Sequence, residues 1–399
     1  MTATTEQIRA CFPALARRHN GLPVAYFDAP GGTQVPSEVV EAMSDYLFHH
    51  NANTHWSYPT SEETDAILLA AREAAADFLN AAPHEIVFGN NMTTLTFHLA
   101  RTLGRTWGRG DEVIVTELDH HANVAPWRAL ERDFGIVVKA ARMIPETAQL
   151  DYEHLASLVS PRTRLVAVGG ASNAVGTIND LERVREAARD ALLFVDAVHL
   201  APHELIDVQR TGCDFLACSS YKFYGPHAGI LFARRELLET LPFPKLEPSP
   251  DTAPERAETG TQNHEGIAGI RATIDFLASL SGSLGARRER LAQTFAALHD
   301  RGLALTRRLW DGLSRVPGVC LYGPPPTARR TPTVAFRVDG LECEQLVRRF
   351  ADAALFVSHG DFYAATCVER LGVPDVVRVG CGAYTTEDEV ERLIATLSS

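Results

Sequence analysis

Lys222 lies in a segment that could present a reactive amine. Residues 218–226 read C-S-S-Y-K-F-Y-G-P, so the lysine follows an apolar run and two serines and stands between two aromatic residues. Aromatic surroundings desolvate an amine and lower its pKa, which raises the share of the neutral, nucleophilic form. A single loop lysine is more often a solvated surface residue, so this segment alone leaves both interpretations open.

Two other apolar runs also end in polar side chains. Val195 is followed by Asp196, and Thr116 is followed by a stretch that contains His120 and His121. A carboxylate after a strand is commonly a cap or turn residue. The paired histidines lack partner ligands at the spacing typical of zinc sites, so we favour an imidazole that stacks on a flat cofactor.

A third feature is a turn that could bind phosphate. Residues 88–94 read F-G-N-N-M-T-T, a Gly/Asn turn that opens a predicted helix with hydroxyl groups in its first turn. Free N–H groups and the helix dipole favour an anion there, although simple capping has the same pattern. The amine, carboxylate, planar ring and phosphate turn together meet the needs of pyridoxal phosphate. No G-x-G-x-x-G motif follows a predicted strand, which disfavours a dinucleotide.

These residues need a scaffold that brings several strand ends together. Between residues 60 and 235, short runs of Val, Ile and Leu alternate with predicted helices. This alternation predicts an α/β fold with a mostly parallel sheet, in which ligands bind at the carboxyl ends of the strands. Two long predicted helices, 267–280 and 286–313, then precede a second alternating region. We predict a large domain over residues 20–265 and a smaller domain formed by residues 1–19 with 266–399, joined by the long helix.

The sequence resembles the class V aminotransferase superfamily of pyridoxal phosphate enzymes, which has fold type I, and within it most resembles the cysteine desulfurases. Matching segments run from A-Y-F-D at 25–28 to Y-T-T-E at 384–387. The resemblance implies a large domain with a mostly parallel sheet, a smaller C-terminal α/β domain, and pyridoxal 5'-phosphate held as a Schiff base on Lys222. It also implies a small amino acid as substrate and a homodimer.

By position, the resemblance implies a role for each residue of the site. Asp196 matches the partner of the pyridinium nitrogen, His120 the residue stacked on the ring, and Asn173 the amide near the phenolic oxygen and the substrate. His199 stands where desulfurases usually have a glutamine that donates to that oxygen, a role that requires the correct tautomer or a cation. The other expected contacts are Ser219, Tyr221 (in place of a histidine), Thr93 and the Met92 backbone at the phosphate, Thr261 at the neighbouring subunit's phosphate, and Arg378 at the substrate carboxylate.

The resemblance stops at the desulfurase nucleophile. Residues 357–364 read V-S-H-G-D-F-Y-A and contain no cysteine where one group of desulfurases has one. His359 and Asp361 are the candidate acid/base or specificity residues of this loop. Cys367 follows in a predicted helix, 364–371, where we expect a buried structural thiol.

Three hypotheses about function follow from this pattern. The first is a desulfurase-like lyase or transferase without the loop cysteine, which includes an aminotransferase or a C–S lyase. The second is a true cysteine desulfurase that uses Cys367. The third is a non-catalytic scaffold that binds the cofactor, which the intact Lys222, Asp196, His120 and Arg378 disfavour.

The composition limits the partners and the compartment. A net charge of -12 argues against a nucleic-acid or anionic-membrane surface. No apolar run approaches the ~20 residues of a membrane helix, and the N-terminus lacks a signal-peptide pattern. The seven cysteines include no C-x-x-C pair, so we expect neither a zinc site nor a disulfide framework. We therefore expect a cytoplasmic enzyme without metal, nucleic-acid or membrane partners.

Overall fold

A seven-stranded sheet forms the centre of the protein, whose computed structural model describes residues 2–398. The strand order is β4-β12-β11-β10-β9-β5-β6; β12 is antiparallel to both of its neighbours, and the other neighbouring pairs are parallel. The strands are β4 (Ile86–Gly89), β5 (Glu112–Thr116), β6 (Val137–Ala141), β9 (Thr163–Gly169), β10 (Leu192–Asp196), β11 (Phe215–Ser219) and β12 (Gly229–Ala233). The predicted mostly parallel sheet is confirmed.

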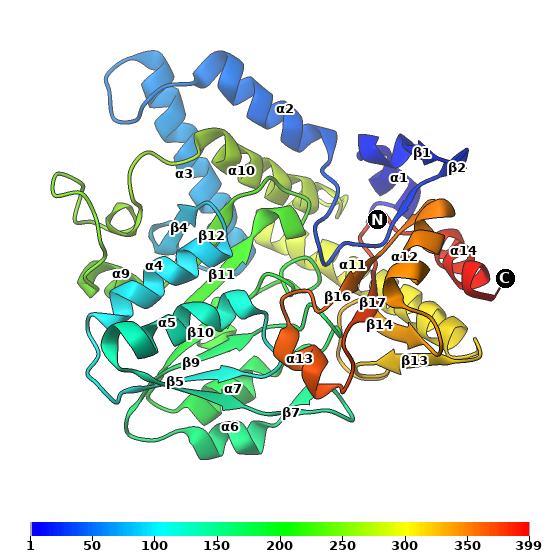
Figure 1. Cartoon of the computed structure of the whole chain (residues 1–399). Helices are drawn as coiled ribbons and strands as arrows, with labels where there is room; N and C mark the ends of the chain where they lie inside the picture. Colours follow the sequence, from blue (N-terminus) through cyan, green and yellow to red (C-terminus); the bar gives the residue numbers. More distant parts are fainter. Residues whose placement is uncertain (1, 399) are drawn as a thin grey trace.

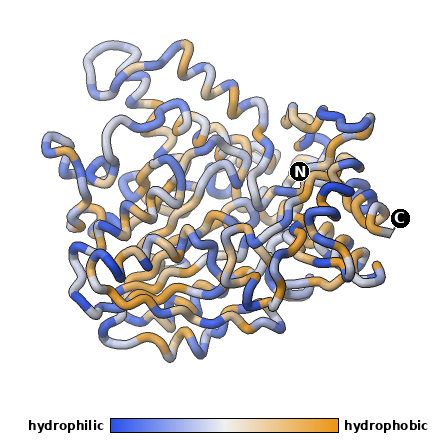
Figure 2. Tube along the Cα trace, in the orientation of Figure 1, coloured by the Kyte–Doolittle hydropathy of each residue, from blue (hydrophilic) through white to orange (hydrophobic). Residues whose placement is uncertain are grey.

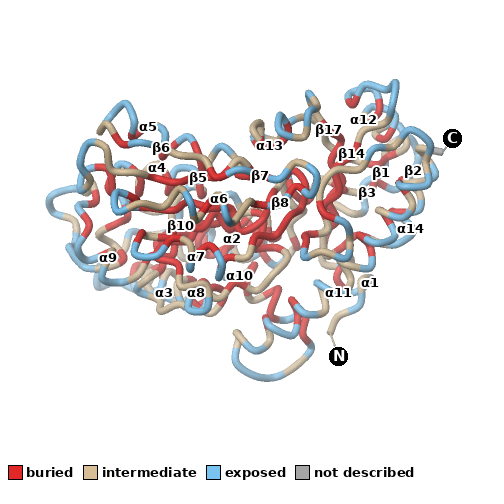
Figure 3. The backbone as a smooth tube through the Cα atoms, turned by 90° about the horizontal axis from the view of Figure 1, so that it is seen from below, coloured by how far each residue is buried: buried red, intermediate tan, exposed pale blue. Residues whose placement is uncertain are grey.

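Helices cover both faces of this sheet, which explains why its strands are apolar on both sides (Figure 1). On β10, Leu193 and Val195 pack into one core, while Phe194 packs into the core on the opposite face. Buried residues and apolar residues therefore coincide along the strands (Figures 2 and 3). The first core includes residues of α3 (Pro59–Leu79), α6 (Tyr152–Leu158), α7 (Leu181–Ala188) and α10 (His264–Ser279), and the second those of α4 (Met92–Gly104), α5 (Ala125–Phe134) and α9 (Arg235–Thr240).

A second, antiparallel sheet lies on the C-terminal side and has its own core. Its order is β13-β14-β17-β16, and Leu309, Phe350 and Leu393 from three helices pack against it. The smaller α/β part of the predicted fold is thereby confirmed. The strands are β13 (Val319–Tyr322), β14 (Thr333–Val338), β16 (Ser358–Gly360) and β17 (Val376–Gly380), and the helices are α11 (Arg287–Leu313), α12 (Cys343–Asp352) and α14 (Glu387–Ser398).

The N-terminal segment crosses to the second sheet. Strand β3 (Ala25–Tyr26) pairs with β15 (Leu355–Phe356), and Phe27 belongs to the core of the second sheet. Gly380 lies against Pro30, where a Cβ atom would come within 2.2 Å of the proline ring, so glycine allows the turn after β3 to pack on the end of β17. The domain boundaries at 20 and 265 stay a prediction, but residues 25–28 pack with the smaller part.

Short elements complete the described chain. None of the helices within residues 2–398 is long and apolar enough to span a membrane. The remaining elements are α1 (Thr5–Ala10), β1 (Arg18–His19), β2 (Leu22–Pro23), α2 (Ser37–Asp45), a π-helical turn η2 (Tyr46–His50), β7 (Met143–Ile144), β8 (Gln149–Leu150), α8 (Val208–Thr211), α13 (Ala365–Arg370) and the 3-10 turns η1 (Pro13–Ala16), η3 (Pro83–Glu85), η4 (His121–Asn123), η5 (Ser220–Lys222) and η6 (Glu255–Ala257).

Candidate active site

One cavity of about 530 Å3 opens at the carboxyl ends of the parallel strands. Gly169, Asp196 and Ser219 are the last residues of β9, β10 and β11, and each lines this cavity. Strand ends that point the same way meet at one edge of a sheet, so residues far apart in the chain converge there. Of the residues predicted from the sequence, the cavity is lined by Met92, Thr93, His120, Asn173, Asp196, His199, Ser219, Tyr221 and Lys222.

Lys222 presents its amine to this cavity from the turn that follows β11. Its Nζ donates to the carbonyl oxygens of Pro30 (2.5 Å) and Gly31 (2.9 Å) and lies 4.9 Å from the centroid of the Tyr221 ring. Burial, assisted by the positive charge of Arg378, lowers the pKa of Lys222 to about 8. The neutral amine is therefore abundant near physiological pH, as a carbonyl-binding lysine requires.

Asp196 places a buried carboxylate at the same edge of the sheet. Its side chain is nearly sealed from solvent, and Oδ1 accepts a hydrogen bond from the Val198 N–H at 2.9 Å. Burial raises the pKa of Asp196 to about 6, while that hydrogen bond and the charge of Lys222 favour the ionised form. A second buried carboxyl, Asp119, accepts hydrogen bonds from the N–H of Gly169 and of Thr116 and orders the loop before His120.

His120 lies in the loop after β5 as a neutral imidazole. Burial and the charge of Lys222 lower the pKa of His120 to about 4. Its Nδ1 accepts a hydrogen bond from the Ala122 N–H at 2.9 Å, so the ring proton is on Nε2. The geometry thus provides a neutral, flat ring at the cavity wall.

The start of α4 and the end of β11 form the opposite end of the cavity. Asn91 caps α4, with its side chain accepting from the Thr94 N–H, and Thr93 is exposed in the first turn. The Met92 N–H, which we expected to be free for phosphate, instead donates to Ser219 Oγ at 2.9 Å. The Ser219 hydroxyl hydrogen is left to donate into the cavity.

Arg378, on β17, is an almost fully buried cation beside the site. Its guanidinium donates to Asp28 Oδ1 (2.8 Å) and to the Asn173 carbonyl oxygen (3.1 Å), and the Phe362 ring lies 3.8 Å from it. Among the residues that the structure describes, its buried Nε has no hydrogen-bond partner. The Asn173 Nδ2 donates to the Phe362 carbonyl oxygen, and its Oδ1 is likewise buried and unpartnered. Unpartnered buried groups of this kind indicate that a ligand completes the site.

Three predicted residues do not line this cavity: Arg378, which lies beside it, and His359 and Thr261. The His359 Nδ1 lies 3.6 Å from Asp375 Oδ2, whereas its neighbour Ser358 bonds Asp28 on the side of Arg378. Adjacent strand residues point to opposite faces, which is why His359 does not share the direction of Ser358. Thr261 is exposed and lines a separate cavity of about 690 Å3 with Arg72 and His264.

The sequence reasoning missed His227 as a cavity residue. Its ring stacks on that of Tyr221, with centroids 4.8 Å apart and planes 16° from parallel. The available signal was its place directly after the Gly-Pro break that follows Lys222. Asn90, Asn91 and Thr94 of the predicted phosphate turn also line the cavity, and the other lining residues, which were not predicted, are Pro30, Ala122, Gly169, Ala171 and Val198.

The fold and the site together define a pyridoxal-phosphate-dependent enzyme of fold type I. An amine with a lowered pKa, a buried carboxylate, a neutral imidazole and a helix N-terminus with hydroxyl groups surround a cavity of suitable size. Lys222 would hold the cofactor, Asp196 would pair with its ring nitrogen, and Ser219 and Thr93 would bind its phosphate. Within residues 2–398, no group of three or more His, Cys, Asp or Glu side chains is arranged to hold a metal ion.

Comparison with known proteins agrees with this assignment. The profile of the family Aminotransferase class-V matches residues 25–393. The cysteine desulfurase of Pectobacterium atrosepticum is 32% identical over 100% of this chain and 98% of its own length. The apo cysteine desulfurase from Thermococcus onnurineus superimposes with a TM-score of 0.90 at 28% identity, covering 100% of this chain and 98% of that one. The cysteine desulfurase CsdA from Escherichia coli, solved with an S-sulfonic acid, has a TM-score of 0.84 at 27% identity, covering 99% and 97%.

The chain therefore belongs to the class V aminotransferase family and is a pyridoxal-phosphate-dependent enzyme. The predicted family, cofactor and enzyme class are confirmed.

Proposed function

We propose that the protein is a lyase or transferase that acts on a small amino acid and does not use a cysteine persulfide. One observation carries this proposal: within residues 2–398, no cysteine lines the cavity that contains Lys222. Desulfurase chemistry needs a mobile thiolate that reaches the substrate sulfur. The site offers an amine, carboxylate and imidazole for amino-acid chemistry, but no thiol.

The loop after β16 supports the proposal because it carries aromatic residues beside the site. Phe362 covers Arg378 and bonds Asn173 through its carbonyl oxygen, and the Tyr363 carbonyl oxygen accepts from the His121 N–H at 2.7 Å. Both Phe362 and Tyr363 have φ of 56°, a backbone conformation that most side chains avoid. The loop is thus built into the wall of the site at some cost in strain.

Cys367 is poorly suited to act as the missing nucleophile. It lies in α13 with no exposed surface, and its Sγ is 3.7 Å from the Met143 Sδ in a small apolar core. Burial raises the pKa of the Cys367 thiol to about 12, so the reactive thiolate is scarce. A true cysteine desulfurase that uses Cys367 is therefore the weaker hypothesis.

Each site residue then has a defined task. When bound, pyridoxal phosphate supplies an electron sink that weakens the bonds at the substrate α-carbon. Nζ of Lys222, neutral above about pH 8, accepts and returns the α-proton. Asp196 holds positive charge at the ring nitrogen, and Arg378 with Asn173 orients the substrate carboxylate. Which bond breaks depends on how these groups orient the substrate.

We also propose a homodimer in which Thr261 serves the neighbouring site. Large apolar side chains are exposed at this cavity: Leu69 (55%) lines it, and Trp56 (62%) directly follows the lining residue His55. Exposed apolar surface of this kind favours burial against another protein surface.

The seven cysteines are all unpaired, which supports a reducing, cytoplasmic location.

Mixed dimers test the role of Thr261. Each of the variants Lys222→Ala and Thr261→Val, when it is alone, is expected to bind the cofactor poorly or to be inactive. Mixing them assembles one intact site per mixed dimer if Thr261 acts across the interface. Recovery of cofactor binding and turnover in the mixture supports the proposal, and an absence of recovery in a verified mixed dimer contradicts it.

A product screen tests the reaction itself. The purified enzyme is offered L-cysteine, cysteine sulfinate, alanine and a panel of other small amino acids, while absorbance and products are followed. We expect keto acid with ammonia, or amino-group transfer to the cofactor, at the same rate in Cys367→Ala as in the wild type. Sulfide release from cysteine that is lost in Cys367→Ala would contradict the proposal and establish a desulfurase.

A further inference from the structure

His199 contacts Thr331, which lies just before β14, and Thr333, the first residue of β14. Its Nε2 lies 3.0 Å from the Thr331 Oγ1 and 3.2 Å from the Thr333 Oγ1. Both threonines have no exposed surface, and His199 is only 4% exposed. His199 also lines the active-site cavity, and within residues 2–398 the hydrogen bonds of its ring are those of Nε2. The ring therefore bridges the cavity and the start of β14.

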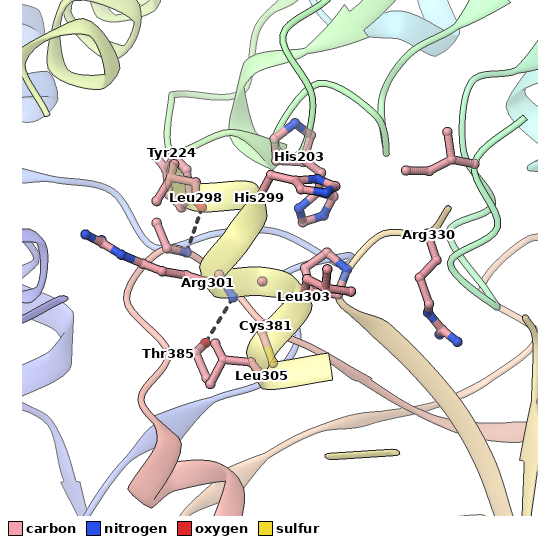
Figure 4. A pocket seen from close by; sticks show the side chains of 16 residues that line it. His203, Tyr224, Leu298, His299, Arg301, Leu303, Leu305, Arg330, Cys381 and Thr385 are labelled. Atoms are coloured by element: carbon pink, nitrogen blue, oxygen red, sulfur yellow. Dashed lines mark hydrogen bonds between the residues drawn. The ribbon is translucent and has the colours of Figure 1, made fainter. Parts of the chain in front are cut away.

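The surroundings of His199 leave the imidazole neutral. His203 packs edge-on with its ring centroid 5.3 Å away, and it also lines a separate, small cavity, shown in Figure 4. Burial holds the pKa of His199 well below its usual range, and the nearby His203, Arg378 and Lys222 lower it further. A neutral imidazole carries one proton, on Nδ1 or on Nε2, and only the first can donate into the cavity.

Counting hydrogens decides between the two tautomers. Within residues 2–398, the Thr333 hydroxyl has one hydrogen-bond partner, Nε2 of His199. In the same range, the Thr331 hydroxyl has one alternative acceptor, the Gly176 carbonyl oxygen at 3.4 Å. If Nε2 carried the proton, the Thr333 hydroxyl hydrogen would be buried without an acceptor, which is costly. If Nε2 is bare, its lone pair accepts the Thr333 hydroxyl hydrogen, the Thr331 hydroxyl can donate to the Gly176 carbonyl oxygen, and both hydroxyl hydrogens have an acceptor.

We propose that Thr331 and Thr333 are positioning residues that hold His199 as the Nδ1–H tautomer, which donates into the cavity to the ring oxygen of the cofactor. The two hydroxyls thereby allow the histidine to donate a hydrogen bond as an amide N–H would. The identity of the acceptor rests on the cofactor placement used in the proposed function, whereas the tautomer is a property of the protein alone.

Histidine-selective 15N NMR of the holoenzyme tests the tautomer. His199→Asn assigns the signal by its loss. In the wild type we expect the protonated nitrogen to be Nδ1, and in the Thr331→Val/Thr333→Val double variant we expect Nε2–H to become populated. The serine variants keep the hydroxyls and should retain the wild-type tautomer. Thr102→Val is the matched control, because that buried hydroxyl bonds only its own helix, at His98 O.

The absorbance of the bound cofactor gives an independent measurement. Loss of a donor at the ring oxygen should raise the pH at which the cofactor absorbance changes, by up to about one unit, the equivalent of one hydrogen bond. A wild-type Nε2–H tautomer, or an unchanged Nδ1–H tautomer in the double variant, would overturn the inference. If the valine variants fail to fold, the tautomer of His199 in the wild type and in Thr333→Ala still tests the inference. Inactivity toward every amino acid would contradict the proposed function alone.

Discussion

Arg378 and Asp28 form an ion pair across the active site although they are 350 residues apart, with the Arg378 Nη2 2.8 Å from the Asp28 Oδ1. Asp28 begins the turn after β3, in which the Pro30 carbonyl oxygen accepts a hydrogen bond from Lys222, and Arg378 lies in β17. The ion pair therefore connects this turn to the second sheet. The arginine side chain is 3% exposed and its Nε is unpartnered. The guanidinium is therefore oriented before any substrate binds, with one donor still available.

We predict that Arg378→Lys weakens amino-acid binding. Lysine presents a point charge and cannot reproduce the fork that bonds Asp28, Asn173 and a carboxylate together. The KM for the amino-acid substrate should rise about tenfold or more, equivalent to about 1.4 kcal/mol, with the cofactor spectrum unchanged. Arg337→Lys is the control, because Arg337 lies on neighbouring β14 and bonds Asp375 instead. Equal KM values for the two variants would remove Arg378 from the substrate site.

The burial of Lys222 should determine how the reactivity of its amine depends on pH. An amine whose pKa is lowered to about 8 becomes neutral at a pH about two or more units below the pH at which an exposed lysine does. The rate at which cofactor-free enzyme binds pyridoxal phosphate covalently should rise with pH and level off above about 8. Stopped-flow absorbance measures this rate, and Lys222→Ala should show neither the covalent band nor turnover. A rate that still climbs through pH 10 would show that the amine is solvated.

The cysteines should react with thiol reagents in the order of their exposure. Cys320 is exposed and Cys11 is partly exposed, while Cys213, Cys218, Cys343, Cys367 and Cys381 are buried. Under native conditions we expect labelling of Cys320 first, with activity retained, and of Cys367 only on unfolding. Mass spectrometry of digested, labelled protein locates the sites. Rapid modification of Cys367 with loss of activity would favour the persulfide hypothesis instead.

Glu258 should be important for stability. It binds Arg72 in a two-point ion pair (2.9 and 2.7 Å) and accepts the Phe88 N–H of β4, and both side chains are largely buried. Glu258→Gln leaves the arginine charge uncompensated, so we expect a loss of about 3 kcal/mol in the free energy of unfolding. Glu239→Gln is the control, because the Arg235–Glu239 pair is exposed and screened by solvent, so its loss should change the stability little. Denaturant unfolding of both variants measures the difference, and similar losses would contradict the expectation.

Local sequence patterns were sufficient to predict the elements that carry the site. The runs at 112–116 and 192–195 are strands β5 and β10, and the helix predicted over 286–313 is α11. Such runs are predictable because burial on both faces makes each of them apolar along its whole length. The smaller part was harder to delimit, since β3 joins β15 from more than 300 residues away.

The sequence by itself determined the family, through a resemblance that spans the chain, and the cofactor. It also determined nine of the residues that line the cavity, because several polar side chains stand directly after apolar runs. Only the tertiary structure decided how those residues are used. It turned His359 toward Asp375, placed Ser219 on the Met92 N–H, and enclosed Cys367. It also brought Thr331 and Thr333 to His199, which is the contact that selects a tautomer. The contacts of Ser219, Cys367 and His199 join segments more than a hundred residues apart, and local sequence patterns do not specify which distant side chains will meet.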